Sequence, residues 1–110
     1  MRVGDLYWVE LRASGGRAQA GRRPAIILQQ TSNLPTVLVV PITSQQDALR
    51  FPGTVLIEST KENGLRHDSV ALVFQLTAID IRHVTNHLGV ASQEVMENIW
   101  QALDDLTGRG

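Results

Sequence analysis

The sequence predicts a mainly β domain that ends in one α-helix, and three observations support this prediction. Six short segments of apolar or alternating residues follow one another between residues 4 and 91. A single segment with helical spacing comes last, and few crossover helices separate the strands. This order favours a strongly curved, mostly antiparallel sheet or a small barrel over a doubly wound fold. The length of 110 residues fits one domain, residues 1–110, because a second core would not fit.

The first three predicted strands lie in the N-terminal half. Residues 4–11 alternate after a Gly–Asp turn, whereas 24–28 and 36–42 are continuous apolar runs typical of central strands, separated by a turn at 31–35. Residues 12–21 contain three glycines and almost nothing to bury, so they predict an exposed, mobile loop.

The C-terminal half supplies the remaining elements. Residues 54–58, 69–73 and 87–91 predict strands, and Gly64 suits a turn that needs a positive φ. Residues 76–84 are ambiguous and fit a short helix or helical turn. For the final helix, Ser92 is a good N-cap and Gly108 a stop signal. Its apolar residues recur at helical spacing and predict one buried face: Val95, Ile99, Leu103 and Leu106.

The charges are unevenly distributed although the net charge is only −1. Residues 1–50 hold six arginines against three acidic residues, and residues 11–46 hold four arginines with no acidic residue. This window is expected to attract anions. Nine of the ten basic residues are arginine, which binds phosphate in bidentate fashion, although a GC-rich genome would produce the same bias.

Several classes of protein and site are disfavoured by what the sequence lacks. Without cysteine there is no disulfide, thiolate nucleophile or cysteine zinc site, which suits a cytoplasmic protein. The longest apolar run, residues 37–42, is too short for a membrane helix, and Asp5 and Glu10 interrupt any signal-peptide pattern. His83 and His87 are spaced i,i+4, but no third ligand is nearby and the acidic residues are scattered, so we expect neither a metal site nor a cofactor.

Arg23 and Thr43 are the strongest candidates for chemistry. Arg23 precedes Pro24 where a basic loop enters a buried strand, and Thr43 follows the other central strand. If the two strands pair antiparallel across the intervening turn, the start of the first lies beside the end of the second. The pairing therefore predicts that Arg23 and Thr43 meet, while a solvated loop end and an ordinary strand end remain the alternative interpretations.

The same segments resemble the MazF/PemK family of toxin endoribonucleases over nearly the whole chain. The matching stretches are residues 4–9, 21–29, 35–44 and 68–72, followed by Leu88–Gly89 and residues 92–94. The resemblance implies an SH3-like small barrel with a C-terminal helix, the plasmid-maintenance toxin fold shared by CcdB and MazF. It also implies a homodimer, metal-independent cleavage of single-stranded RNA, and inhibition by a MazE-like antitoxin.

Residue by residue, the family's catalytic arginine and threonine fall on Arg23 and Thr43, and a glutamine near its active groove falls on Gln75. Two positions depart from the family: Phe74 stands where an acidic residue is common, and Thr77 stands where an arginine is common. These departures predict a less charged groove wall. We also expect RNA contacts from further polar residues: Arg12, Arg17, Arg22, Ser44 and His67.

The expected reaction uses the RNA's own 2′-OH, which attacks the adjacent phosphorus and leaves a 2′,3′-cyclic phosphate. Arg23 would stabilise the phosphorane charge and Thr43 would hydrogen-bond a non-bridging oxygen. The general base is unidentified, with His67 as an assistant. Trp8 and Phe74 fit base stacking, although core packing is the more common role for such residues.

Two alternative functions remain open on the sequence. A CcdB-like gyrase poison shares the expected fold but depends on an aromatic C-terminal end, whereas this sequence finishes Thr107–Gly108–Arg109–Gly110, with Trp100 inside the helix. A non-catalytic RNA-binding barrel, including a degenerate toxin, would bind RNA without cutting it.

Overall fold

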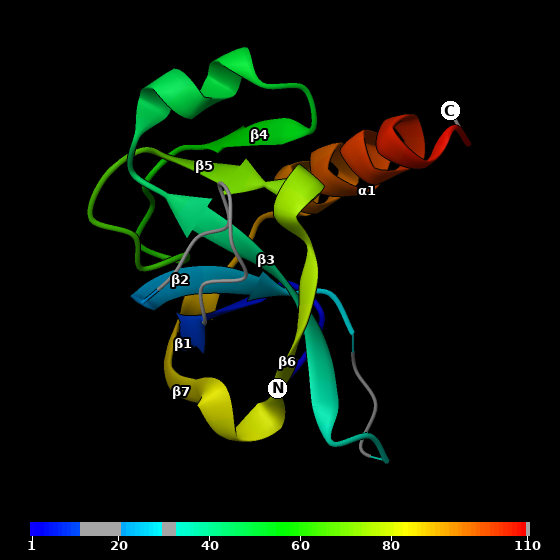
Figure 1. Cartoon of the computed structure of the whole chain (residues 1–110). Coiled ribbons are helices and arrows are strands. Elements are labelled where there is room, and N and C mark those ends of the chain that lie inside the picture. The colour runs from blue at the N-terminus through cyan, green and yellow to red at the C-terminus, as the bar shows by residue number, and fades with distance from the viewer. Residues whose placement is uncertain (12–20, 30–32, 110) are drawn as a thin grey trace.

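The computed structural model describes residues 1–11, 21–29 and 33–109, and Figure 1 shows a curved sheet with one long helix packed at one end. Three short 3₁₀ turns interrupt the chain: η1 (Gln46–Arg50), η2 (Val73–Gln75) and η3 (Ile81–His83). The strands are β1 (Asp5–Leu11), β2 (Gly21–Ile27), β3 (Thr36–Thr43), β4 (Thr54–Ile57), β5 (Ser69–Leu72), β6 (Thr77–Asp80) and β7 (Val84–Val90), and the helix is α1 (Gln93–Thr107).

All strand pairs are antiparallel, and the sheet runs in the order β4-β5-β3-β2-β1-β7. One edge of β3 pairs with β2, while its other edge pairs first with β6 and then, at Ile42 and Thr43, with β5. This change of partner falls around Pro41, which has no N–H to donate. The mainly β fold with one C-terminal helix is therefore confirmed. Within the described ranges the end strands β4 and β7 do not pair, so the sheet is curved but not closed.

The central strands are buried on both faces, which explains their continuous apolar sequences. One face joins the larger core, where Ile26, Ile42 and Ile99 of α1 are at most 1% exposed. The other face joins a smaller core that includes Ala25 and Ile79. Since residues of β2 alternate between these two cores, adjacent side chains at its N-terminal end also face opposite sides.

The helix begins and ends where the sequence predicts. The Ser92 hydroxyl accepts a hydrogen bond from the Val95 N–H at 3.1 Å, and Gly108 adopts a left-handed conformation with φ of 77°. Gly64 also has the predicted positive φ, 72°, and a Cβ there would clash with the carbonyl oxygen of Leu88. The segment between β4 and β5 consequently packs directly on β7.

One predicted boundary was wrong in a way that affects the site, and one segment that was ambiguous in the sequence is assigned by the structure. β2 begins at Gly21 rather than Pro24, because residues 21–23 pair with β1 as a two-stranded ribbon. The ambiguous stretch 76–84 contains the four-residue strand β6, then the helical turn η3 and the first residue of β7. The rest of the predicted loop, residues 12–20, lies outside the described residues. No helix in the described part of the chain is long and apolar enough to cross a membrane.

Candidate active site

Arg23 and Thr43 lie at neighbouring ends of the two central strands. In the antiparallel register of β2 and β3, Ala25 pairs with Pro41. Arg23 lies two residues before Ala25 and Thr43 two residues after Pro41, so continuing the same register places Arg23 opposite Thr43. Both residues line one cavity of about 290 Å³. The predicted convergence on one side of the sheet is confirmed, whereas the catalytic role of the pair is untested by the fold alone.

Arg23 is held by the scaffold but keeps hydrogen-bonding capacity. It lies within β2 opposite Val9 of β1, so the expectation that Arg22 and Arg23 end a flexible loop was wrong. Its Nε is buried and has no hydrogen-bond partner among the described residues. Because a buried donor without an acceptor is costly, this N–H is suited to a ligand oxygen.

The Thr43 hydroxyl is positioned by the first residues after β3. The side chain is only 4% exposed, and its Oγ1 accepts a hydrogen bond from the backbone N–H of Gln45 at 3.1 Å. A hydroxyl that accepts in this way can still donate its own hydrogen. Thr43 therefore offers a donor whose oxygen is fixed by the backbone.

The remaining wall of the Arg23–Thr43 cavity comes from η1, η2 and the residues beside them, including Leu72 of β5. Gln75 lines it as predicted, together with Phe74, whose ring packs against Phe51 with centroids 5.7 Å apart. Phe74 thus gives this wall the predicted apolar character. Asp47 of η1 also lines the cavity, and sequence reasoning missed it. No signal pointed to η1, because a five-residue turn that holds only Ala48 and Leu49 as apolar residues shows no apolar periodicity.

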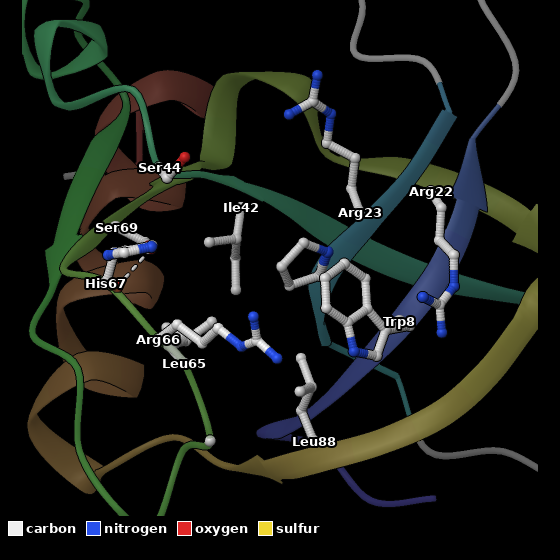
Figure 2. A pocket seen from close by; sticks show the side chains of 12 residues that line it. Trp8, Arg22, Arg23, Ile42, Ser44, Leu65, Arg66, His67, Ser69 and Leu88 are labelled. Carbon is white, nitrogen blue, oxygen red and sulfur yellow. Dashed lines mark hydrogen bonds between the residues drawn. The ribbon is translucent and has the colours of Figure 1, made fainter.

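A second cavity of about 640 Å³ lies at the same strand ends, and Figure 2 shows the side chains that line it. Its apolar lining includes Trp8, Ile42 and Leu88, and its polar lining includes the arginines and His67. Arg23 lines both cavities, so they adjoin at this residue. We call this second space the Trp8 cavity.

Arg22 is ordered on the rim of the Trp8 cavity. Its guanidinium carbon lies 4.6 Å from the ring centroid of Trp8, and its Nη2 donates to Oδ1 of Asn86 at 3.0 Å. The cation–π contact and the hydrogen bond hold the charge at the cavity mouth. This arrangement supports the predicted anion-binding role of Arg22 without testing it.

The other predicted RNA contacts divide between described and undescribed parts of the chain. Ser44 and His67 line the Trp8 cavity, away from Thr43, while Arg12 and Arg17 lie outside the described residues. For Trp8 and Phe74 the sequence favoured core packing, and this expectation was wrong. Trp8 is half-buried against its cavity, and Phe74 is 39% exposed.

The histidine pair does not occupy one helix. His83 belongs to η3 and His87 to β7, where the His87 ring meets Tyr7 edge-on with centroids 5.0 Å apart. His87 Nε2 also lies 3.9 Å from Oδ1 of Asp5. Across the described residues, no three potential metal-ligating side chains of histidine, cysteine, aspartate or glutamate gather together.

Comparison with known proteins agrees with this geometry. Residues 2–107 match the family described as the PemK-like, MazF-like toxin of type II toxin–antitoxin systems. The chain is 36% identical over 107 residues to endoribonuclease MazF of Staphylococcus saprophyticus, covering 94% of this chain and 88% of the relative. It is 32% identical over 106 residues to endoribonuclease EndoA of Bacillus subtilis, covering 94% and 90%.

Solved structures show the same fold. MazF from Deinococcus radiodurans superposes with a TM-score of 0.83 at 25% identity, covering 98% of this chain and 96% of that one. A MazE–MazF structure from the same organism gives 0.76 at 24% identity, covering 100% and 97%. With the family match spanning almost the full length, the chain belongs to the PemK-like, MazF-like family of type II toxin–antitoxin toxins.

Proposed function

We propose that this MazF-type endoribonuclease toxin cuts single-stranded RNA without a metal ion, using Arg23 and Thr43 on the scissile phosphate. One observation carries the proposal: Arg23, whose buried Nε–H has no partner among the described residues, and Thr43, whose hydroxyl oxygen is held by the backbone, line the same small cavity. Both groups are donors, and a phosphodiester presents acceptor oxygens.

The reaction requires the protein to position the RNA and to stabilise the negative charge that develops on the phosphate. The ribose 2′-OH attacks the neighbouring phosphorus, the bond to the 5′-oxygen breaks, and a 2′,3′-cyclic phosphate and a 5′-OH are left. Negative charge grows on the non-bridging oxygens in the transition state. Arg23 stabilises this charge in bidentate fashion, and Thr43 donates to one of the oxygens.

Arg23 is a poor proton acceptor because a guanidinium stays protonated at any physiological pH. We therefore assign it charge stabilisation and a hydrogen bond to the leaving 5′-oxygen. The 2′-OH gives its proton to solvent water, and the 5′-oxygen takes one up from solvent. The role of Gln75 is to hold the RNA in the same cavity, which it lines beside Phe74. Arg22, Ser44 and His67 contact the strand in the adjoining Trp8 cavity.

The toxin acts as a homodimer in the cytoplasm, where its messenger RNA substrate and a cognate MazE-like antitoxin are also found. The Deinococcus structure of MazE with MazF supports this choice of partner. Exposed apolar side chains, including Leu38, Leu49 and Phe74, provide surface for a protein partner. Light scattering on the purified toxin, alone and with its antitoxin, measures both assemblies.

The test of the proposed function is cleavage of a long single-stranded RNA by the purified protein in excess EDTA. We expect fragments that carry a 2′,3′-cyclic phosphate and a 5′-OH. A matched oligonucleotide with one deoxyribose at a mapped cut position should bind and stay intact, because it lacks the nucleophile. Binding of normal RNA without cleavage would instead identify a non-catalytic RNA-binding protein, and cleavage of the deoxyribose substrate would exclude 2′-OH attack.

A further inference from the structure

The described lining of the Trp8 cavity is rich in arginine. Arg22, Arg66 and His67 line it, Arg23 lies at its junction with the catalytic cavity, and no aspartate or glutamate is among its described lining residues. Arg66 has no ion-pair or hydrogen-bond partner among the described residues. Figure 2 shows its side chain reaching across the cavity toward Trp8.

The segment that carries Arg66 is held in place by hydrogen bonds. Asn63 is buried, and its Oδ1 accepts from the backbone N–H groups of Thr60 at 3.1 Å and Leu65 at 3.0 Å. Its Nδ2 donates to the Glu58 carbonyl at 2.8 Å. This network fixes the backbone immediately before Arg66, so the guanidinium is presented from a structured turn.

The volume and lining of the cavity are sufficient to hold an unstacked nucleobase. Its volume of about 640 Å³ lies within the usual range for small-molecule sites, ~300–1,000 Å³. Trp8 provides an aromatic ring, over which the Arg22 guanidinium already lies 4.6 Å from the centroid. Apolar contacts come from Ile42, Leu65 and Leu88. Single-stranded RNA is commonly read by splaying a base onto an aromatic ring.

The hydrogen-bonding groups in the cavity discriminate between bases. A guanidinium has only donors, so Arg66 favours a base edge that presents acceptors. Guanine and uracil present carbonyl oxygens where adenine and cytosine present amino groups. Facing a guanidinium, an amino group would leave two donors unpaired, which is costly in a partly desolvated site.

We propose that the Trp8 cavity binds a keto base, guanine or uracil, of the nucleotide next to the scissile phosphate, and that Arg66 selects it. The inference rests on the proposed function, because the shared residue Arg23 places the cavity beside the cleavage site. Arg66 is a specificity-determining residue and has no part in the chemical step. The sequence preference of the toxin therefore depends on Arg66, while its reaction depends on Arg23.

The experiment is cut-site mapping on a long RNA with the full-length protein, by sequencing the new 5′-OH ends. The wild type should prefer guanine or uracil at one fixed position beside the cut. Arg66→Gln should reduce that preference about tenfold while cleavage at other sites continues. Arg109→Gln removes an equal charge from outside both cavities and should leave the preference unchanged.

The outcomes separate this proposal from the proposed function. If Arg23→Ala retains cleavage, the proposed catalytic role fails whatever the cut preference is. If the wild type shows no keto preference beside the cut, or Arg66→Gln keeps it unchanged, the base subsite is overturned. An Arg66→Gln variant that keeps its cut preference but is no longer inhibited by the antitoxin would show that the cavity binds a peptide of the antitoxin. This result would also overturn the proposed base subsite.

A binding measurement tests the same subsite without cleavage. Trp100→Phe removes the second tryptophan, which is 40% exposed on α1, and leaves Trp8 as the fluorescent reporter. Guanosine 5′-monophosphate should quench Trp8 at lower concentration than adenosine 5′-monophosphate, and Arg66→Gln should abolish the difference. Equal quenching by the two nucleotides in the Arg66-containing protein would contradict the proposal.

Discussion

The two cavities at the ends of β2 and β3 differ in size, lining and chemistry although they share Arg23. The Arg23–Thr43 cavity is about 290 Å³, and its described donors include a buried N–H and a hydroxyl whose oxygen is fixed. The Trp8 cavity is about 640 Å³, has an aromatic ring and is rich in arginine. The smaller space suits transition-state stabilisation, and the larger one suits recognition of a base.

The alternation of side chains along β2 explains why the two cavities differ. Arg23 lies on the same face of the strand as Ala25, which packs in the smaller core. Pro24 lies on the same face as Ile26, which packs in the larger core. Consecutive residues of one strand therefore serve two spaces. A toxin built in this way can change its sequence preference in one cavity without disturbing the reaction in the other.

The largest expected effect comes from Arg23, which borders both cavities. Arg23→Ala should lower RNA cleavage at every site by ~10² or more, because one transition-state donor is lost. Arg23→Lys should also remain impaired, since lysine does not reproduce the bidentate fork. Single-turnover cleavage measures the effect, and circular dichroism confirms folding. Wild-type rates in a folded Arg23→Ala variant would remove the functional distinction between the cavities.

A smaller loss is expected from Thr43, which lines only the catalytic cavity of the two. Thr43→Ala should reduce the cleavage rate by ~10-fold to 10²-fold, whereas Thr43→Ser keeps the hydroxyl and should recover most of the activity. The distribution of cut sites should not change in either variant, because base recognition lies in the other cavity. Mapping the residual cuts checks this. A shifted cut preference in Thr43→Ala would show that the two cavities are not functionally separate.

The difference between the cavities also explains which parts of the site were predictable. The meeting of Arg23 and Thr43 follows from one antiparallel pairing between neighbouring strands, so two apolar runs and a turn were sufficient. The helix was equally predictable because Ser92 and Gly108 are local signals. The extension of β2 through Arg22 was missed, since pairing with β1 overrides the polar sequence.

The Trp8 cavity was not predictable in the same way. Trp8, Arg66 and Leu88 come from three separate parts of the chain, and a sequence pattern does not encode which distant segments meet. Close packing of residue 64 against Leu88 brings the β4–β5 segment onto β7. Strand β6 was also ambiguous, because four residues flanked by 3₁₀ turns show too short a pattern to distinguish from a helical turn.

A modest, uniform effect is expected from Arg22 on the rim of the Trp8 cavity. Arg22→Gln should weaken binding of RNA by a similar factor for all sequences. It should also reduce the slope of log affinity against log salt by ~0.7, the value for one phosphate contact on a single strand. Filter binding with uncleavable deoxyribose-containing RNA measures both, with Arg109→Gln as the matched control. An unchanged salt slope would argue that Arg22 only supports Trp8.

The smallest effect is expected at the far end of β3, remote from both cavities. Asp80 pairs with Thr36, at the opposite end of the eight-residue strand from Thr43. The Arg82 side chain donates to the Asp80 carboxylate, from Nη2 at 2.7 Å and Nε at 3.1 Å. These hydrogen bonds, together with one from the Arg82 backbone, hold the pKa of Asp80 well below its usual range.

A lowered pKa in the folded state means that the charged carboxylate stabilises the fold above the unfolded-state pKa, about 3.9, and that this contribution is lost as the pH falls. Asp80→Asn should therefore lower the melting temperature slightly at pH 7, and the difference from the wild type should shrink below about pH 4. The effect stays small because the pair is solvent-exposed. RNA binding, cut-site preference and cleavage rate should all match the wild type at pH 7. A loss of any of them in a folded Asp80→Asn protein would place functional contacts beyond the two cavities.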